Sequence, residues 1–76
     1  MLIDPAAAAT LLAAIEEGAL DRAASRLHLT PSAVSQRIRQ LEDQVGRRPL
    51  VRSRPIRATE AGEAVLRFAR RHAELR

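Results

Sequence analysis

Apolar residues recur along the chain at the spacing of amphipathic helices, and glycine or proline separates the recurring segments. The first segment opens at Asp4-Pro5, an N-cap residue followed by proline at the first helical position, and it ends at Gly18. A shorter segment covers 20–27, where two adjacent alanines would let helices cross closely. The pattern therefore predicts two helices in the first third of the chain.

The segment after the turn at 28–30 predicts a third helix with two different faces. Thr30 has the hydroxyl of an N-cap, and Pro31 fits the first helical position. One face is an apolar stripe formed by Val34, Ile38, Leu41 and Val45. The other face carries hydroxyls, amides and a guanidinium, from Ser32, Ser35, Gln36, Arg39 and Gln40. Such groups match the edges of base pairs and the phosphates beside them.

The third helix is expected to end near Gly46, after which the pattern changes to short extended runs. Runs at 50–52 and 56–58 flank Ser53-Arg54-Pro55, which predicts a small β-hairpin, the wing, with an arginine at its tip. Such a wing can place Arg54 in a minor groove while Arg52 and Arg57 hold phosphates. The alternative is a basic hairpin that only faces solvent.

Thr59 begins the last predicted helix, with acidic residues near the positive end of the helix dipole. Five side chains repeat at spacings of four and three, as in a coiled-coil seam: Ala61, Val65, Phe68, His72 and Leu75. We expect this seam to be a dimer interface, because so short a chain cannot easily cover it alone. The alternative is that the helix folds back on the core of its own chain.

Composition narrows the function. A chain of 76 residues makes one small domain, and its lack of cysteine excludes a disulfide, a thiolate metal site and a thiol nucleophile. Two distant histidines and exposed serines do not make a catalytic pocket, so we expect no enzyme, metal site or cofactor in this chain. No apolar stretch approaches the roughly 20 residues of a membrane span, and the first residues lack a signal-peptide pattern. We expect a cytoplasmic protein with no membrane partner.

Charge is unevenly distributed along the chain. All 13 basic residues are arginine, and the net charge is +4. Seven arginines lie in 37–57 against two acidic residues, whereas 1–17 holds three acidic residues and no basic one. A basic flank beside a two-faced helix is expected of a nucleic-acid-binding protein. Arg22 and Arg26, one turn apart on the second helix, either face solvent or contact phosphates.

Taken in order, these segments resemble the N-terminal DNA-binding domain of LysR-type transcriptional regulators, a bacterial family. The resemblance rests on the first helix, RAASRL at 22–27, TPSAVSQRIRQLE at 30–42, Gly46 and TEAG at 59–62, and it covers nearly the whole chain. Most of the family enters the wing with a Leu-Phe-x-Arg run, whereas this chain has Leu50-Val51-Arg52. The stretch 51–59 is more similar to the branch that controls lysine and arginine export.

The resemblance implies a mainly α fold. A winged helix-turn-helix with a three-helix core and a small β-hairpin wing would occupy 1–58, and the start of a linker helix that joins two copies would occupy 59–76. The third helix would enter the major groove of a dyad operator and the wing the adjacent minor groove. The resemblance also implies a C-terminal domain, absent from this chain, that binds a small effector such as lysine or arginine. It implies a homodimer and leaves open a higher-order assembly of the full-length protein.

Carried over position by position, the resemblance assigns base contacts to Pro31, Ser32, Ser35 and Gln36. The full set of expected DNA-binding residues is Thr30, Pro31, Ser32, Ser35, Gln36, Arg37, Arg39, Gln40, Arg52, Arg54 and Arg57. Many relatives have arginine where this chain has Gln36, and an amide suits adenine rather than guanine.

Two other functions use the same surface. A winged-helix module for protein–protein interaction would dock its basic wing on an acidic partner, although the face from Ser32 to Gln40 favours base edges. Sequence-independent architectural binding would keep the phosphate contacts without base recognition. The three alternatives differ in whether a preferred duplex sequence exists.

Overall fold

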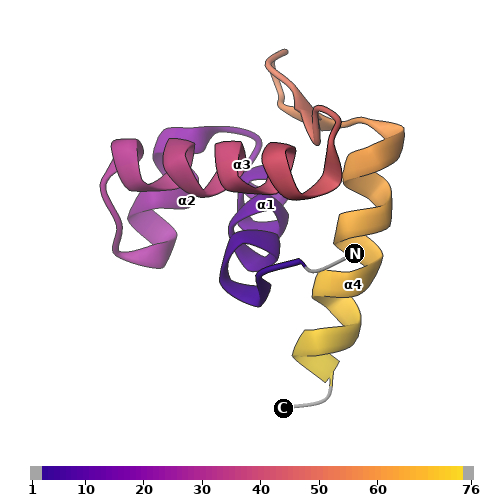
Figure 1. The fold of residues 1–76 in the computed structure, drawn as a ribbon. Coiled ribbons are helices and arrows are strands. Elements are labelled where there is room, and N and C mark those ends of the chain that lie inside the picture. The colour runs from indigo at the N-terminus through magenta and orange to yellow at the C-terminus, as the bar shows by residue number, and fades with distance from the viewer. Residues whose placement is uncertain (1–2, 75–76) are drawn as a thin grey trace.

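The computed structural model describes residues 3–74, with side chains described as far as Arg71. Its elements are α1 (Pro5–Glu17), α2 (Leu20–Leu27), α3 (Pro31–Val45), β1 (Leu50–Val51), β2 (Arg57–Ala58) and α4 (Glu60–Glu74). Helix α1 is central, because it packs against α2, α3 and α4, and the hairpin rises beside the C-terminal end of α3 (Figure 1). The predicted mainly helical fold with one small hairpin is confirmed.

The predicted helix ends are confirmed by their capping contacts. The Asp4 carboxylate accepts a hydrogen bond from the N–H of Ala6, and Thr30 Oγ1 accepts one from Ala33 at 3.1 Å. At the other ends of α1 and α3, Gly18 and Gly46 adopt φ of +77° and +79°. Glycine occupies this left-handed region without a steric penalty, so both helices stop where the sequence predicts.

The core lies where α1, α3 and α4 meet. Leu11, Leu41 and Leu66 are fully buried, one from each of these helices. Where α1 crosses α2, the buried residues are all small: Ala13, Ala14 and Ala23. Small side chains let the two backbones approach, and the larger residues fill the space between the other helices. The buried stripe of α3 is Val34, Ile38 and Leu41, as its periodicity predicts.

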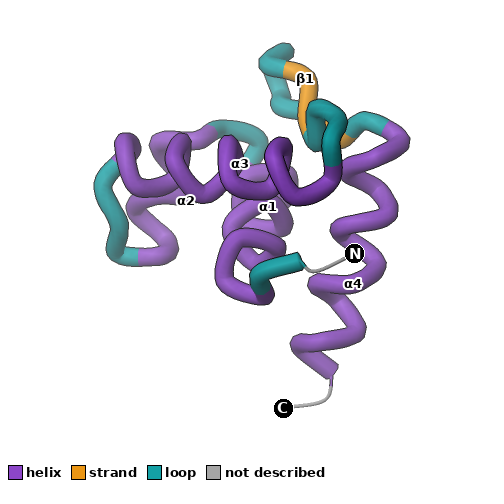
Figure 2. The backbone as a smooth tube through the Cα atoms, in the orientation of Figure 1, coloured by secondary structure: helices purple, strands orange, loops and turns teal. Residues whose placement is uncertain are grey.

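The wing is shorter as a sheet than the sequence predicts. Strands β1 and β2 pair antiparallel over two residues each, with Leu50 opposite Ala58 and Val51 opposite Arg57 (Figure 2). The N–H of Ile56 does not continue this ladder, because it donates to the carbonyl oxygen of Gly18 at 3.0 Å. The descending side of the wing is therefore attached to the α1–α2 turn at Ile56, just before its two paired residues.

Helix α4 packs along α1, and this contact buries one residue of the predicted dimer seam. Val65 has no exposed surface, because it lies in the core of its own chain together with Leu66 and Ala69. It therefore cannot offer a free surface to a second copy. Ala61 and Phe68 are half-buried at the edge of this contact. His72 and Leu75 have no described side chains, so their places in the seam are outside the described residues.

Within residues 3–74, no helix is both long enough and apolar enough to cross a membrane. Among the residues with described side chains, no group of three or more histidine, aspartate or glutamate side chains could hold a metal ion.

Candidate nucleic-acid interface

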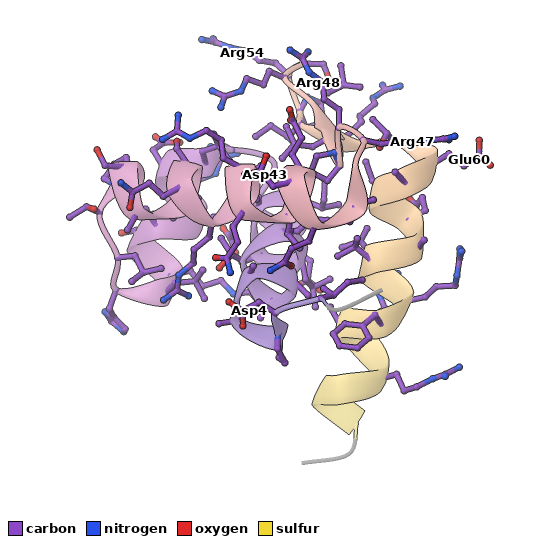
Figure 3. The ribbon with its side chains drawn as sticks, in the orientation of Figure 1. Asp4, Asp43, Arg47, Arg48, Arg54 and Glu60 are labelled. Atoms are coloured by element: carbon purple, nitrogen blue, oxygen red, sulfur yellow. The ribbon has the colours of Figure 1, made fainter. Side chains whose placement is uncertain are left out.

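The outer face of α3 is a row of exposed polar side chains at helical spacing. Its members are Ser32, Gln36, Arg39 and Asp43. Ser35 lies half-buried at the edge of the row. In Figure 3, Asp43 lies on the upper side of α3, which is also the side from which the wing rises. The row and the wing therefore face the same way, and the row is acid-free until its C-terminal end.

Thr30, at the start of α3, caps the helix and is also exposed to solvent. The hydroxyl oxygen of Thr30 accepts the Ala33 N–H, yet the residue itself is exposed, as is Pro31 beside it. A hydroxyl has one proton and two lone pairs, so the Thr30 O–H remains able to donate to an outside acceptor.

Two of the predicted DNA-binding residues contact α1 or its N-cap residue. Arg37 Nη1 donates to Thr10 Oγ1 at 3.4 Å. Gln40 Nε2 donates to Asp4 Oδ2 at 3.3 Å. The structure thus separates Arg37 and Gln40 from the outer row and gives both side chains partners within the chain.

The arginines of the wing are all exposed: Arg52, Arg54 and Arg57. Arg54 projects from the top of the wing, beyond the outer face of α3 (Figure 3). Among the residues with described side chains, ion pairs join Arg26 to carboxylates of α1, and the arginines between positions 37 and 57 form none. The guanidinium groups of the wing are therefore not ion-paired to any carboxylate of these residues.

A groove of about 270 Å³ separates the C-terminal half of α3 from the root of the wing. We call it the basic groove, and its lining residues are Ile38, Arg39, Glu42, Arg48, Pro49, Leu50 and Arg52. Sequence reasoning missed Arg48. The sequence shows two adjacent arginines, Arg47 and Arg48, and does not distinguish them. The fold places Arg48, and not Arg47, in the lining of the groove.

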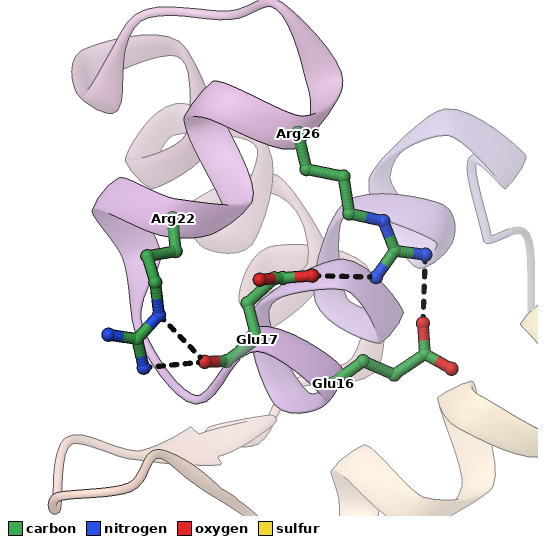
Figure 4. A network of polar contacts seen from close by, with 4 residues as sticks. All are labelled: Glu16, Glu17, Arg22 and Arg26. Carbon is green, nitrogen blue, oxygen red and sulfur yellow. Dashed lines mark hydrogen bonds and ion pairs between the residues drawn. The ribbon is translucent and has the colours of Figure 1, made fainter.

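The exposed arginines of α2 have structural partners (Figure 4). Arg26 forms ion pairs with Glu16 at 2.9 Å and Glu17 at 3.3 Å, and the hydrogen bond to Glu16 is the main cause that raises its pKa above the ordinary value. Arg22 donates through Nε and Nη2 to the carbonyl oxygen of Glu17, at 3.1 and 2.7 Å. This carbonyl lies in the last turn of α1, where cations are favoured. The contacts favour a structural role over phosphate binding.

The root of the wing is attached to the first turn of α4. The N–H of Thr59 donates to the carbonyl oxygen of Pro49 at 3.1 Å, and its hydroxyl donates to that of Arg48. The same hydroxyl oxygen accepts the N–H of Gly62 at 3.1 Å. Gly62 packs so closely that a Cβ there would overlap the Pro49 carbonyl oxygen. These contacts hold the segment that carries Arg48 against α4.

Comparison with known sequences places the chain in a family. The model described as bacterial regulatory helix-turn-helix protein, lysR family, matches residues 6–63. The HTH-type transcriptional regulator LysG of Mycobacterium tuberculosis is 59% identical over 61 residues, which are 80% of this chain and 20% of LysG. The lysine export transcriptional regulatory protein LysG of Corynebacterium glutamicum is 48% identical over 62 residues, 82% of this chain and 21% of that protein. The chain thus spans about a fifth of the length of these curated relatives.

Solved structures agree with the sequence comparison. The full-length LysG from Corynebacterium glutamicum with bound effector Arg matches with a TM-score of 0.91 and 44% identity, over 95% of this chain and 25% of that chain. The CbnR_DBD–DNA complex matches with a TM-score of 0.85 and 36% identity, over 95% of this chain and 84% of that chain.

The likeness covers the recognition segment, the wing and the start of α4, and the names of the relatives confirm the resemblance to the lysine and arginine export branch. The predicted winged helix-turn-helix fold is likewise confirmed. The chain belongs to the lysR family of bacterial regulatory helix-turn-helix proteins.

Proposed function

We propose that this chain binds double-stranded DNA in a sequence-specific manner, as the operator-binding part of a longer LysR-type regulator of basic amino-acid export. The observation that carries the proposal is a common orientation: the wing rises from the side of α3 on which Asp43, the last member of the outer row, lies, and Arg54 projects from the top of the wing. Neither the row before Asp43 nor the wing contains a carboxylate. The 36% identity to a domain solved as a DNA complex supports the same function.

In this proposal α3 enters the major groove and the wing lies on the adjacent minor groove. Base edges are contacted by the start of α3, through Pro31, Ser32, Ser35 and Gln36. Phosphates are contacted by Thr30, Arg39, Arg52 and Arg57, and Arg54 enters the minor groove. The exposed positions of these side chains support the assignment, apart from half-buried Ser35.

Arg37 and Gln40 stay in the proposed interface as phosphate contacts from the edge of α3. Each uses only one described donor toward α1, and a guanidinium has five N–H donors in a fixed fork. Their contacts to Thr10 and Asp4 would then orient the remaining donors. A loss of DNA affinity in an Arg37→Gln variant, without loss of stability, would support this role.

The dimer is proposed to form through α4 over 59–76, with 1–58 as the DNA-binding unit. Because Val65 serves the core, the contact to the second copy would use the neighbouring positions Ala61, Phe68, His72 and Leu75. Two copies related by a dyad would place two α3 helices in successive major grooves. Sedimentation that finds only monomer, even at high concentration, would argue against this arrangement.

The effector is proposed to be a basic amino acid, bound by a domain outside this chain. Support comes from full-length LysG of Corynebacterium glutamicum, whose structure holds the effector Arg. We assign no catalytic role and no cofactor to the residues of this chain, and we place the regulator with its operator in the bacterial cytoplasm.

Selection from a random duplex library at moderate salt, followed by affinity measurements over a salt series, tests the proposal. An enriched dyad motif together with a steep salt dependence supports a sequence-specific regulator. Binding without enrichment indicates architectural binding, and no binding to any duplex would favour a protein partner instead.

A further inference from the structure

The basic groove brings together side chains from three places in the sequence. Arg39 comes from α3, Arg48 from the turn after α3, and Arg52 from the residue after β1. Glu42 of α3 adds a carboxylate, and the remaining lining residues are apolar and buried: Ile38, Pro49 and Leu50. The groove is therefore a hollow of about 270 Å³ that combines buried apolar residues with exposed charged ones.

The charges in the groove leave an excess of positive charge. Three guanidinium groups and the carboxylate of Glu42 line it, so the formal charge is 3 − 1 = +2. None of the three arginines forms an ion pair or a side-chain hydrogen bond among the residues with described side chains. Their forks of N–H donors therefore have no acceptor among those residues, and a phosphate has the oxygen geometry that such forks bind.

We propose that the basic groove binds one phosphodiester group of the DNA backbone in each half-site, and that Arg48 is a DNA-binding residue. The inference rests on the proposed function and adds a contact to it. The groove lies between the helix assigned to the major groove and the wing assigned to the minor groove. The backbone strand that separates those two grooves would pass over it, and one of its phosphates would meet Arg39, Arg48 and Arg52 together.

In this arrangement, Glu42 lowers the affinity of the basic groove for phosphate. Its carboxylate lines the same groove and repels the incoming phosphate, so it limits the affinity that three arginines would otherwise produce. Replacement by glutamine keeps the shape of the side chain and removes the charge. We expect Glu42→Gln to bind the selected duplex roughly two- to fivefold more tightly at moderate salt.

The matched pair Arg48→Gln and Arg47→Gln provides the first test. Both changes remove one charge from the same exposed turn, but only Arg48 lines the groove. We expect Arg48→Gln to weaken binding about tenfold and to reduce the slope of log affinity against log salt by about one. Arg47→Gln should change affinity less than about twofold, as expected of a charge that touches no phosphate. Equal losses in the two variants would overturn the proposal.

A duplex that carries one uncharged methylphosphonate at a time provides the second test, and inorganic phosphate alone provides the third. Wild-type chain should lose affinity at one linkage per half-site, and Arg48→Gln should lose nothing further there. The DNA assignment would be overturned if a methylphosphonate caused no loss of affinity at any linkage. It would also be overturned if inorganic phosphate bound the groove while no methylphosphonate changed the affinity for DNA. If wild-type chain bound no duplex at all, the proposed function itself would fail, which is a different outcome.

Discussion

Helix α3 and the wing carry the two halves of the proposed interface, but they are held in place by different means. Helix α3 has 15 residues, a cap at each end and its own buried stripe. The wing has two strands of two residues, and its position depends on contacts with Gly18, Thr59 and Gly62. The comparison shows that a recognition helix can be determined by its local sequence, whereas a short hairpin needs distant residues to orient it.

The largest expected effect comes from the attachment of the wing root to α4. In Gly62→Ala, the new Cβ would overlap the Pro49 carbonyl oxygen, and a backbone atom cannot move aside as a flexible side chain can. We expect a loss of about 3 kcal/mol in the free energy of unfolding, measured in urea. Ala64→Gly, at an exposed position of the same helix, should cost only about 1 kcal/mol. Equal costs would show that the close contact is unimportant.

The next largest effects distinguish the function of α3 in DNA binding from that of the wing. Gln36→Ala should relax base preference at one operator position, at a cost of about 1–3 kcal/mol on the preferred base, if the amide makes a bidentate contact. Arg54→Gln should weaken binding to most duplexes and lower the salt slope by about one. Affinity across a panel of single-base operator variants measures both. Uniform losses in both variants would refute the division between base recognition by α3 and backbone binding by the wing.

Gly18 and Gly46 test whether the wing depends on the α1–α2 turn. Both have positive φ, so alanine at either position costs about 1–2 kcal/mol of backbone strain. At Gly18 the added Cβ would also lie 3.1 Å from Pro55 Cβ, whereas at Gly46 nothing lies within 4 Å. Gly18→Ala should therefore weaken DNA binding more than Gly46→Ala does.

A double-mutant cycle of Gly18→Ala with Arg54→Gln tests why Gly18→Ala should weaken DNA binding more than Gly46→Ala does. If Gly18 acts through the position of the wing, its effect on affinity should shrink in a chain that already lacks Arg54. An unchanged effect would mean that Gly18 contributes to stability alone.

The smallest expected difference concerns the two threonine N-caps. Thr30→Ala removes one hydrogen bond, to the N–H of Ala33, and should cost about 1 kcal/mol. Thr59→Ala removes the bond from Gly62 and also the bond to the Arg48 carbonyl oxygen, so it should cost roughly 2 kcal/mol. Urea unfolding of both variants measures the difference. The same cost at both caps would indicate that the bond to Arg48 adds nothing to stability.

The predictions that succeeded from sequence concern local structure. Asp4, Thr30, Gly18 and Gly46 mark helix ends because capping depends on residues within one turn of the end. The buried stripe of α3 follows from its period alone. The expected interface residues Gln36 and Arg39 are exposed for the same reason.

The predictions that changed concern contacts between distant segments. Val65 lies at helical spacing in an apparent seam, yet that spacing is equally compatible with packing on α1, and only the fold decides between them. The wing strands are shorter than predicted because Ile56 donates its N–H to Gly18, which is 38 positions away in sequence.

The sequence by itself determined the helix ends, the apolar and polar faces of α3, the basic hairpin and the family, because all of these depend on local order and spacing. Only the tertiary structure decided which arginine of the pair Arg47-Arg48 lines the basic groove. It also decided that Arg37 and Gln40 contact α1 and that the wing is attached to the turn at Gly18. The physical reason is that a side chain's neighbours across the fold depend on how helices pack, and no local pattern contains that information.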